Sequence, residues 1–134
     1  MKIKPVLKKN PINGKELFYL YPVYTDTLEL RDLLPEISNA SSITAGDVRA
    51  VVESFVEILQ RYLVRGNKIK IDGIGVFKLS IKSSGNENAK EITANDVLST
   101  KVTYLSDSKL RNYVDSNIRY EKIKEDVSGK TETN

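Results

Sequence analysis

The spacing of apolar residues changes several times along the chain and marks out its elements. Near the start, residues 2–9 and 16–24 form two runs rich in apolar and aromatic residues, and the pair Asn13-Gly14 lies between them. Asn-Gly between two strand-like runs is a strong signal for a β-hairpin. The pattern therefore predicts a two-stranded hairpin over the first 24 residues.

A helical spacing follows the hairpin. Apolar residues recur three and four positions apart over residues 30–37. Asp26 with Glu29 three positions later makes a capping-box pattern, so we expect a helix that begins at Asp26 or Thr27. Pro35 removes one backbone hydrogen bond inside this helix and clashes with the preceding turn, so we expect a kink or a break there.

Residues 44–66 carry the clearest helical pattern. Thr44 caps this segment with Asp47 in the capping-box position, and Gly66 is expected to end it. Its apolar stripe is wide and consists of Val48, Val51, Val52, Phe55, Ile58, Leu59 and Leu63. A stripe of this width fits either an ordinary core or a core shared between two subunits.

From residue 69 the period becomes two, which is typical of strands. Residues 69–71 and 77–81 alternate apolar residues with lysine or serine, and Gly73-Ile74-Gly75 lies between them. We expect two adjacent strands joined by a tight glycine turn, with Phe77 and Ile81 facing inward. The polar residues 83–90 are expected to form a mobile loop before a returning strand with Val102 and Tyr104 on one face.

The last third of the chain predicts one more helix and a short strand. Ser106 is a plausible cap for a helix whose inward residues would be Leu110, Tyr113 and Val114. Residues 118–123 suggest a short final strand. From about residue 125 the sequence is polar and is expected to be disordered. Helices and strands together indicate an α+β fold, and 134 residues suit one domain.

Composition excludes several kinds of chemistry. The chain has no cysteine and no histidine, so disulfides, thiolate nucleophiles, Ser-His-Asp triads and His-based zinc sites are ruled out. No paired-acid motif stands out, and we expect a protein that is not an enzyme and has no catalytic residues, metal site, cofactor or small-molecule substrate. No apolar run is long enough to span a membrane, and the start lacks the apolar stretch of a signal peptide.

Charge is distributed unevenly although its total is only +3. Residues 1–27 carry five lysines against two acids, and residues 67–106 carry six lysines against four acids. Residues 28–66 carry four arginines against six acids. Both strand regions are therefore basic and the helical region is acidic. A basic sheet surface can attract a polyanion, although a solvated lysine-rich face is an equally good interpretation at this level.

Several passages resemble the HU/IHF family of bacterial histone-like proteins. Residues 65–71, Arg-Gly-Asn-Lys-Ile-Lys-Ile, are similar to the family's Lys-Gly-Asp-Lys-Val-x-Leu passage. Residues 73–77, Gly-Ile-Gly-Val-Phe, resemble its Gly-Phe-Gly-Thr-Phe signature, and Tyr104 stands where the family has an aromatic residue. Residues 106–114 look like its final helix. The resemblance covers roughly residues 27–116, and the added hairpin is similar to a longer variant subgroup.

The resemblance implies an intertwined homodimer with a helical base, a β-sheet saddle and two β-ribbon arms, which carries an N-terminal hairpin in addition. In the family the arms embrace the DNA minor groove and a proline at each tip wedges between bases. Here the interval from Lys78 to Thr103 has four lysines but neither arginine nor proline, and Glu87, Glu91 and Asp96 dilute its charge. Intercalation by proline is therefore not supported.

The resemblance predicts non-sequence-specific binding to the phosphate backbone and minor groove of double-stranded DNA, as a nucleoid-associated protein of the cytoplasm. The alternative is a structural or protein-interaction module that keeps the fold with weak or no DNA binding. We expect a hairpin extension over residues 1–25, the DNA-binding domain over residues 26–123 and a tail over residues 124–134. The expected DNA contacts are Lys68, Lys70, Lys78, Lys82, Lys90, Lys101 and Arg111.

Overall fold

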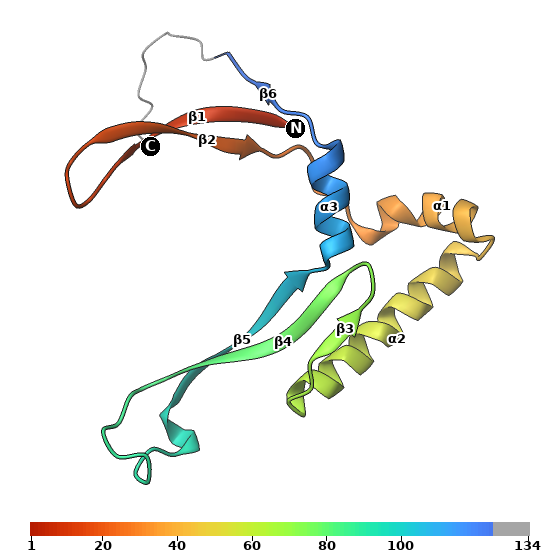
Figure 1. Ribbon diagram of the computed structural model, residues 1–134. Coiled ribbons are helices and arrows are strands. Elements are labelled where there is room, and N and C mark those ends of the chain that lie inside the picture. Colours follow the sequence, from red (N-terminus) through yellow and green to blue (C-terminus); the bar gives the residue numbers. More distant parts are fainter. Residues whose placement is uncertain (125–134) are drawn as a thin grey trace, which may run out of the picture. The chain divides into compact units, whose positions relative to one another are not determined.

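The computed structural model describes residues 1–124, and the chain forms two compact units (Figure 1). The first unit contains residues 1–27 together with the chain from Ser116 onward, and the second contains residues 28–115. The tail expected from about residue 125 lies outside the described residues. Each unit has its own three-stranded sheet.

The first unit is built on the predicted hairpin, which the structure confirms. Strands β1 (Lys2–Lys9) and β2 (Glu16–Val23) pair antiparallel along their whole length. The turn closes on Asn10, whose carbonyl accepts from the Gly14 amide at 2.9 Å. Gly14 has φ +68°, a conformation that glycine adopts without a steric cost. The short strand β6 (Glu121–Lys122) pairs parallel with β1 on its other edge.

The second unit begins with helix α1 (Leu30–Ser41), which starts later than the sequence pattern suggested. Glu29 precedes the first turn, and its amide donates to the Asp32 carboxylate at 2.8 Å. The expected start at Asp26 or Thr27 is therefore wrong, because the reciprocal cap forms between Glu29 and Asp32. The helix also continues through Pro35, so the break expected there does not occur. Pro35 is the sixth residue of the helix, where one backbone hydrogen bond is lost and the rest of the helix is kept.

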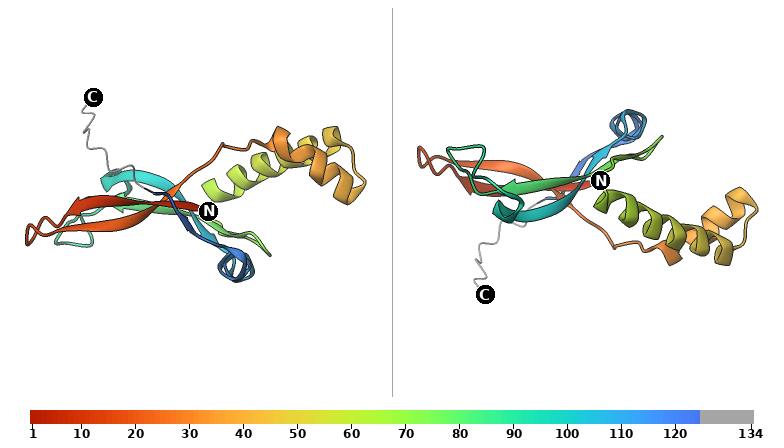
Figure 2. Two further views of the ribbon diagram at one scale, coloured as in Figure 1. Left: turned by 90° about the horizontal axis from the view of Figure 1, so that it is seen from above. Right: turned by 90° about the horizontal axis from the view of Figure 1, so that it is seen from below.

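Helix α2 (Ala45–Val64) agrees with its sequence signals. The Thr44 hydroxyl oxygen accepts from the Asp47 amide at 3.2 Å, and its hydroxyl donates to the Asp47 carboxylate at 2.6 Å. The helix ends before Gly66, which has φ +88° and donates its amide to the Leu63 carbonyl. Helices α1 and α2 form a helical hairpin, seen in orange and yellow in both views of Figure 2.

The sheet of the second unit has the strand order β3-β4-β5, all antiparallel. Its strands are β3 (Ile69–Ile71), β4 (Gly75–Ser83) and β5 (Val97–Ser106). Beyond β3, strands β4 and β5 continue as a two-stranded ribbon that ends in residues 84–96, including the 3₁₀ turn η1 (Ala94–Asp96) (Figure 1). We refer to β4, β5 and residues 84–96 together as the arm.

The glycine turn between β3 and β4 is held by a close approach of two strands. Gly75 has φ +146°, and a Cβ atom there would lie 2.1 Å from the Leu105 carbonyl oxygen. The hydroxyl of Tyr104 donates to the Ile74 carbonyl at 2.7 Å, and the Asp107 amide donates to the same oxygen at 2.9 Å. Only glycine fits at residue 75, because any side chain would collide with the backbone of β5.

Helix α3 (Ser108–Asn117) follows β5 after one residue, and its cap differs from the expected one. The Asp107 carboxylate accepts from the amides of Lys109 at 3.3 Å and Gly73 at 3.2 Å. Ser106 is instead the last residue of β5, so its assignment as the cap is wrong. Asp107 takes that role because its carboxylate reaches both the first turn of the helix and the glycine turn.

The described chain has almost no core of its own. Among the described residues, the only buried apolar side chains are Leu34, 6% exposed, and Leu63, 5% exposed. The inward placement expected for Ile81, Leu110, Tyr113 and Val114 is wrong for the single chain, where all four are exposed. Ile81 is 65% exposed because it lies on the part of β4 that extends beyond its partner β3. Most side chains of the predicted apolar pattern are therefore exposed in the single chain.

Candidate nucleic-acid interface

The expected DNA contacts gather chiefly on one face of the β3-β4-β5 sheet. Neighbouring residues of an antiparallel pair share a face, and each strand alternates between faces. Lys78 pairs with Thr103, Ser80 with Lys101, and Lys82 with Ser99. Lys70 pairs with Val76, which lies two residues from Lys78 on the same face. We refer to Lys70, Lys78, Lys82 and Lys101 as the arm lysine face.

This face is strongly positive because no acid interrupts it. None of the three strands contains aspartate or glutamate, and all four lysines of those strands fall on this one face. All four are exposed. Ion pairs found within residues 1–124 join Arg31 to Glu29 and Arg61 to Glu57, so they leave these lysines available. Ser80, Ser99 and Thr103 lie among Lys78, Lys82 and Lys101, whereas the apolar pair Val76 and Leu105 lies between Lys70 and Lys78.

The opposite face of the same sheet is apolar. Phe77 pairs with Tyr104, and the two ring centroids lie 5.2 Å apart. Leu79 pairs with Val102 on the same face, as the sequence alternation predicted. Helix α2 contacts β3 and β4, while Val102 farther along the arm stays 62% exposed. The sheet thus places all its lysines on the face opposite the Phe77–Tyr104 pair.

Three further residues expected at the interface lie elsewhere. Lys68 precedes β3 and Lys90 lies in the connection at the end of the arm, both exposed. Arg111 lies in the second turn of α3, and its guanidinium donates to the carbonyl and hydroxyl oxygens of Ser106. That hydrogen bonding gives Arg111 a structural role at the β5–α3 junction, whatever else it contacts.

The end of the arm is organised by local hydrogen bonds. The amides of Asn88 and Lys90 donate to the side-chain oxygens of Asn86 and Asn88, at 2.9 and 3.0 Å. The Ser84 amide donates to the Asp96 carbonyl at 2.9 Å and closes the base of this segment. Two asparagine side-chain oxygens are therefore already used within the segment, which leaves Lys90 as its one cationic group for a polyanion.

A second basic surface lies outside the expected DNA contacts, in the hairpin whose lysines the sequence already marked as basic. In the first unit, Lys2, Lys4 and Lys8 of β1 lie on the face of the hairpin that also carries Tyr19 and Tyr21. The ammonium of Lys8 lies 4.7 Å from the centre of the Tyr21 ring. The alternation of lysines along residues 2–8 was a usable signal, but pairing them with the tyrosines required the strand register.

A helical hairpin, a three-stranded sheet that extends into a ribbon and a short final helix define an α+β fold of the HU/IHF type. The chain belongs to the family described as "HU domain fused to wHTH, Ig, or Glycine-rich motif", whose model matches residues 1–122.

Comparison with characterised proteins agrees with this family. Integration host factor subunit alpha from Neisseria meningitidis is 34% identical over 93 residues, which cover 65% of this chain and 87% of that protein. The same subunit from Psychrobacter cryohalolentis is 28% identical over 94 residues, which cover 69% of this chain and 95% of that protein.

Two solved structures share the fold. A putative bacterial DNA-binding protein from Bacteroides vulgatus aligns with TM-score 0.61 and 15% identity over 91% of this chain. This chain spans about half of that protein, 48% of its length. Anabaena HU in its cocrystal structure with DNA aligns with TM-score 0.51 and 17% identity, over 65% of this chain and 97% of HU.

Proposed function

We propose that this protein is a non-enzymatic, nucleoid-associated architectural protein of the cytoplasm that binds double-stranded DNA as a homodimer. The observation that carries the proposal is the arm lysine face, with four exposed lysines and no acid on one side of a sheet. Its relatives support it, since they include integration host factor subunits and HU in complex with DNA. The domain would cover residues 26–123, with the hairpin over residues 1–25 as an addition.

The proposed mechanism is neutralisation of phosphates at the minor groove. Lysine is a compact point charge on a flexible stem, which suits phosphate oxygens and gives little discrimination between bases. Base readout requires bidentate arginine, asparagine or glutamine in a groove, and the arm has no arginine or glutamine. Its Asn86 and Asn88 side chains are engaged in local turns. Binding should therefore be insensitive to sequence.

The arm should bend DNA less than an arm with a wedge at its tip. Family arms insert an apolar side chain between base pairs, and the resulting kink lets more DNA contact the protein. No proline lies between Lys78 and Thr103. We therefore expect the bound duplex to stay close to straight. Lys68, Lys90 and Arg111 would add to the affinity that the arm lysine face provides.

Dimerisation is proposed from the uncovered apolar surface. A folded chain must bury enough apolar area to offset its loss of conformational entropy, and only Leu34 and Leu63 are buried among the apolar residues described. On α2, Val51 is 67% exposed, and Phe55 and Ile58 are exposed as well. A second copy that covers this stripe would supply the missing core, so folding and association should be inseparable.

A pair of charge variants tests the dimer. Val51→Glu places a carboxylate in the apolar stripe, and Gln60→Glu adds the same charge half a helical circumference away. Multi-angle light scattering should give about twice the 15.1 kDa of one chain for the wild type and for Gln60→Glu. Val51→Glu should give unfolded or monomeric protein. A wild type that stays at 15.1 kDa at micromolar concentration would refute the dimer.

A salt series tests DNA binding. Log affinity for a duplex should fall linearly with log salt concentration, because bound lysines release counterions from DNA. Replacing Lys78 and Lys82 together by alanine should weaken binding to duplexes of every sequence alike, and should flatten the slope by up to about two units. If this variant binds as tightly as the wild type at low salt, the arm lysine face is not the contact surface.

The second candidate function is a structural or protein-interaction module with little DNA binding. The acids Glu87, Glu91 and Asp96 near the arm's end favour it, together with exposed apolar residues such as Ile92 and Leu98. This second function predicts that duplex DNA does not bind even at low salt, so that no dependence of affinity on salt concentration is seen. The same titration therefore separates the two functions.

A further inference from the structure

The hairpin sheet of the first unit has two chemically different faces. Lys4 pairs with Tyr21, Val6 with Tyr19, and Lys8 with Leu17, so these side chains share one face. Ile3, Pro5 and Leu7 pair with Pro22, Leu20 and Phe18 on the other face. We refer to Lys2, Lys4, Lys8, Tyr19 and Tyr21 as the lysine–tyrosine face.

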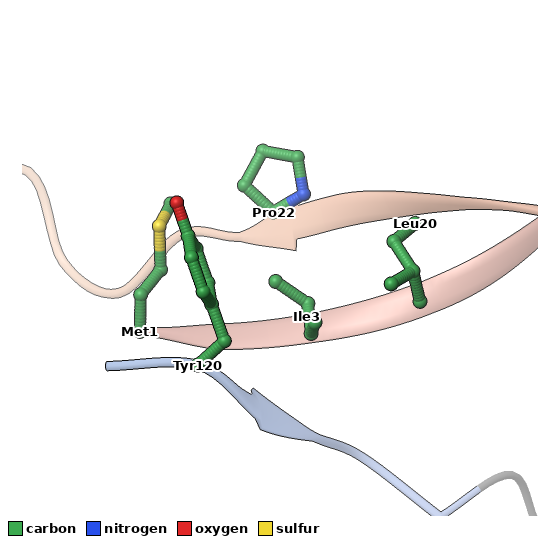
Figure 3. Close-up of a pocket in the computed structure, with 5 residues that line it drawn as sticks. All are labelled: Met1, Ile3, Leu20, Pro22 and Tyr120. Atoms are coloured by element: carbon green, nitrogen blue, oxygen red, sulfur yellow. The ribbon is translucent and has the colours of Figure 1, made fainter. Parts of the chain in front are cut away.

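The apolar face already has a local neighbour. Ile3, Leu20 and Pro22 line a groove of about 430 Å³ with Met1 and Tyr120, and the Tyr120 ring stands beside Met1 there (Figure 3). Part of this face is thus covered by the chain just before β6 in the same unit. On the lysine–tyrosine face, Glu121 pairs in register with Lys2, and Tyr19 lines a groove with Lys8 and the turn residues Pro11 and Ile12.

Charge on the lysine–tyrosine face concentrates at Lys4 and Lys8. Glu121 offsets Lys2 at one end of the sheet, and Glu16 pairs with Lys9, which places both on the opposite face. No acid of β1 or β2 lies beside Lys4 or Lys8 on this face. The exposed ammonium groups therefore favour an anionic ligand, while the neighbouring rings add a second requirement.

The tyrosine rings distinguish this face from the arm lysine face. Tyr19 is 48% exposed, and the Lys8 ammonium lies 4.7 Å from the Tyr21 ring centre. Between Lys78, Lys82 and Lys101 of the arm the side chains are serine and threonine, which offer nothing on which a base could stack. An exposed ring beside a cation on a flat sheet suits a ligand that has both phosphates and free base faces.

We propose that the lysine–tyrosine face binds single-stranded DNA, with phosphates at Lys4 and Lys8 and a base stacked on the exposed ring of Tyr19, while the Tyr21 ring positions the Lys8 ammonium. Duplex DNA does not fit this description, because its base faces are stacked within the helix, whereas a single strand exposes them. The choice of DNA among nucleic acids rests on the proposed function. The protein would then have separate surfaces for duplex and for single-stranded DNA.

The test uses the full chain and two labelled ligands, an oligothymidylate of about 16 nucleotides and a duplex of equal length. Fluorescence anisotropy would compare wild type with Tyr19→Ala/Tyr21→Ala and with the ring-preserving Tyr19→Phe/Tyr21→Phe. The alanine pair should lose about tenfold or more in affinity for oligothymidylate, since stacking on one ring is worth roughly that much. The phenylalanine pair should bind as the wild type does, and duplex affinity should not change in either.

Lysine variants make the test independent of the folding of the tyrosine variants. Lys4→Gln/Lys8→Gln should weaken oligothymidylate binding and flatten its salt slope by about 1.4 units, the value for two phosphate contacts on a single strand. Lys78→Ala/Lys82→Ala should weaken duplex binding alone, and its failure to do so would count against the arm and not against the hairpin. The inference is overturned if the Lys4/Lys8 pair, or a folded Tyr19/Tyr21 alanine pair, binds oligothymidylate as the wild type does. It is also overturned if either pair weakens duplex binding by the same factor.

Discussion

The hairpin β1–β2 and the ribbon β4–β5 are both antiparallel pairs that gather lysines on one face, yet they are stabilised differently. In the ribbon, a glycine turn brings two backbones into contact, and the rings of Phe77 and Tyr104 pack on the face opposite the lysines. In the hairpin, residues 10–15 join the two strands, and Phe18 on its apolar face remains 65% exposed. Alternation of polar and apolar residues thus specifies two faces, but it does not say how either face is used.

The largest expected difference between the two pairs lies in one glycine of each, Gly75 at the start of β4 and Gly14 in the turn between β1 and β2. Gly75→Ala should cost about 3 kcal/mol or more, because its Cβ would collide with the Leu105 carbonyl oxygen in a strained backbone conformation. Gly14→Ala should cost only about 1–2 kcal/mol, because its φ of +68° is strained but its surroundings are open. Urea unfolding at fixed protein concentration measures both. Gly85→Ala, with nothing within 4 Å and no positive φ, is the control. Equal losses at residues 14 and 75 would contradict the close approach.

A second comparison uses the phenylalanines of the two apolar faces. Phe77→Ala should lose about 2–3 kcal/mol, less than the 3–5 kcal/mol of a fully buried ring, because Phe77 is half-buried against Tyr104. Phe18→Ala should lose less than about 1 kcal/mol, since most of its surface is exposed. Thermal unfolding followed by circular dichroism would rank them. A larger loss for Phe18 would mean that another chain covers the hairpin's apolar face in solution.

A third comparison concerns duplex binding by the two lysine faces. Lys78→Ala/Lys82→Ala should flatten the salt dependence of duplex affinity by up to about two units, whereas Lys2→Ala/Lys4→Ala should leave it nearly unchanged. The reason is that serine and threonine between the arm lysines leave room for a phosphate backbone, while the hairpin face presents rings. Titrations at four salt concentrations or more would give both slopes. A flatter slope for the hairpin pair would make that face part of the duplex interface.

The smallest expected effect is the cation–π contact of the hairpin. Lys8→Gln should lower stability by about 0.5–1 kcal/mol, because the ammonium lies 4.7 Å from the Tyr21 ring centre. Lys82→Gln removes a lysine at a similar strand position and should leave the free energy of unfolding unchanged. Both values come from urea midpoints in low salt. If both substitutions change the free energy of unfolding equally, the contact between Lys8 and the Tyr21 ring does not stabilise the hairpin.

Sequence patterns located most elements but missed helix caps. The hairpin, α2 and the strands of the arm appear where their periodicity placed them, because two and 3.6 residues per repeat are local properties of the chain. The caps at Glu29 and Asp107 were misassigned, since which of several nearby polar residues caps a helix depends on where the chain enters it. The Asp107 carboxylate also bonds the Gly73 amide, 34 positions away in the sequence, and no local pattern reveals such a contact.

For the candidate site, the sequence alone determined which strands are basic, that arginine and proline are absent from the arm, and that no histidine or cysteine chemistry exists. Tertiary structure decided which lysines share a face, because a shift of one residue in strand register would move every side chain to the opposite side. It also joined Lys8 to Tyr21 and left most apolar side chains exposed. Composition and periodicity are carried by each segment separately, whereas register and burial exist only once strands pair and helices pack.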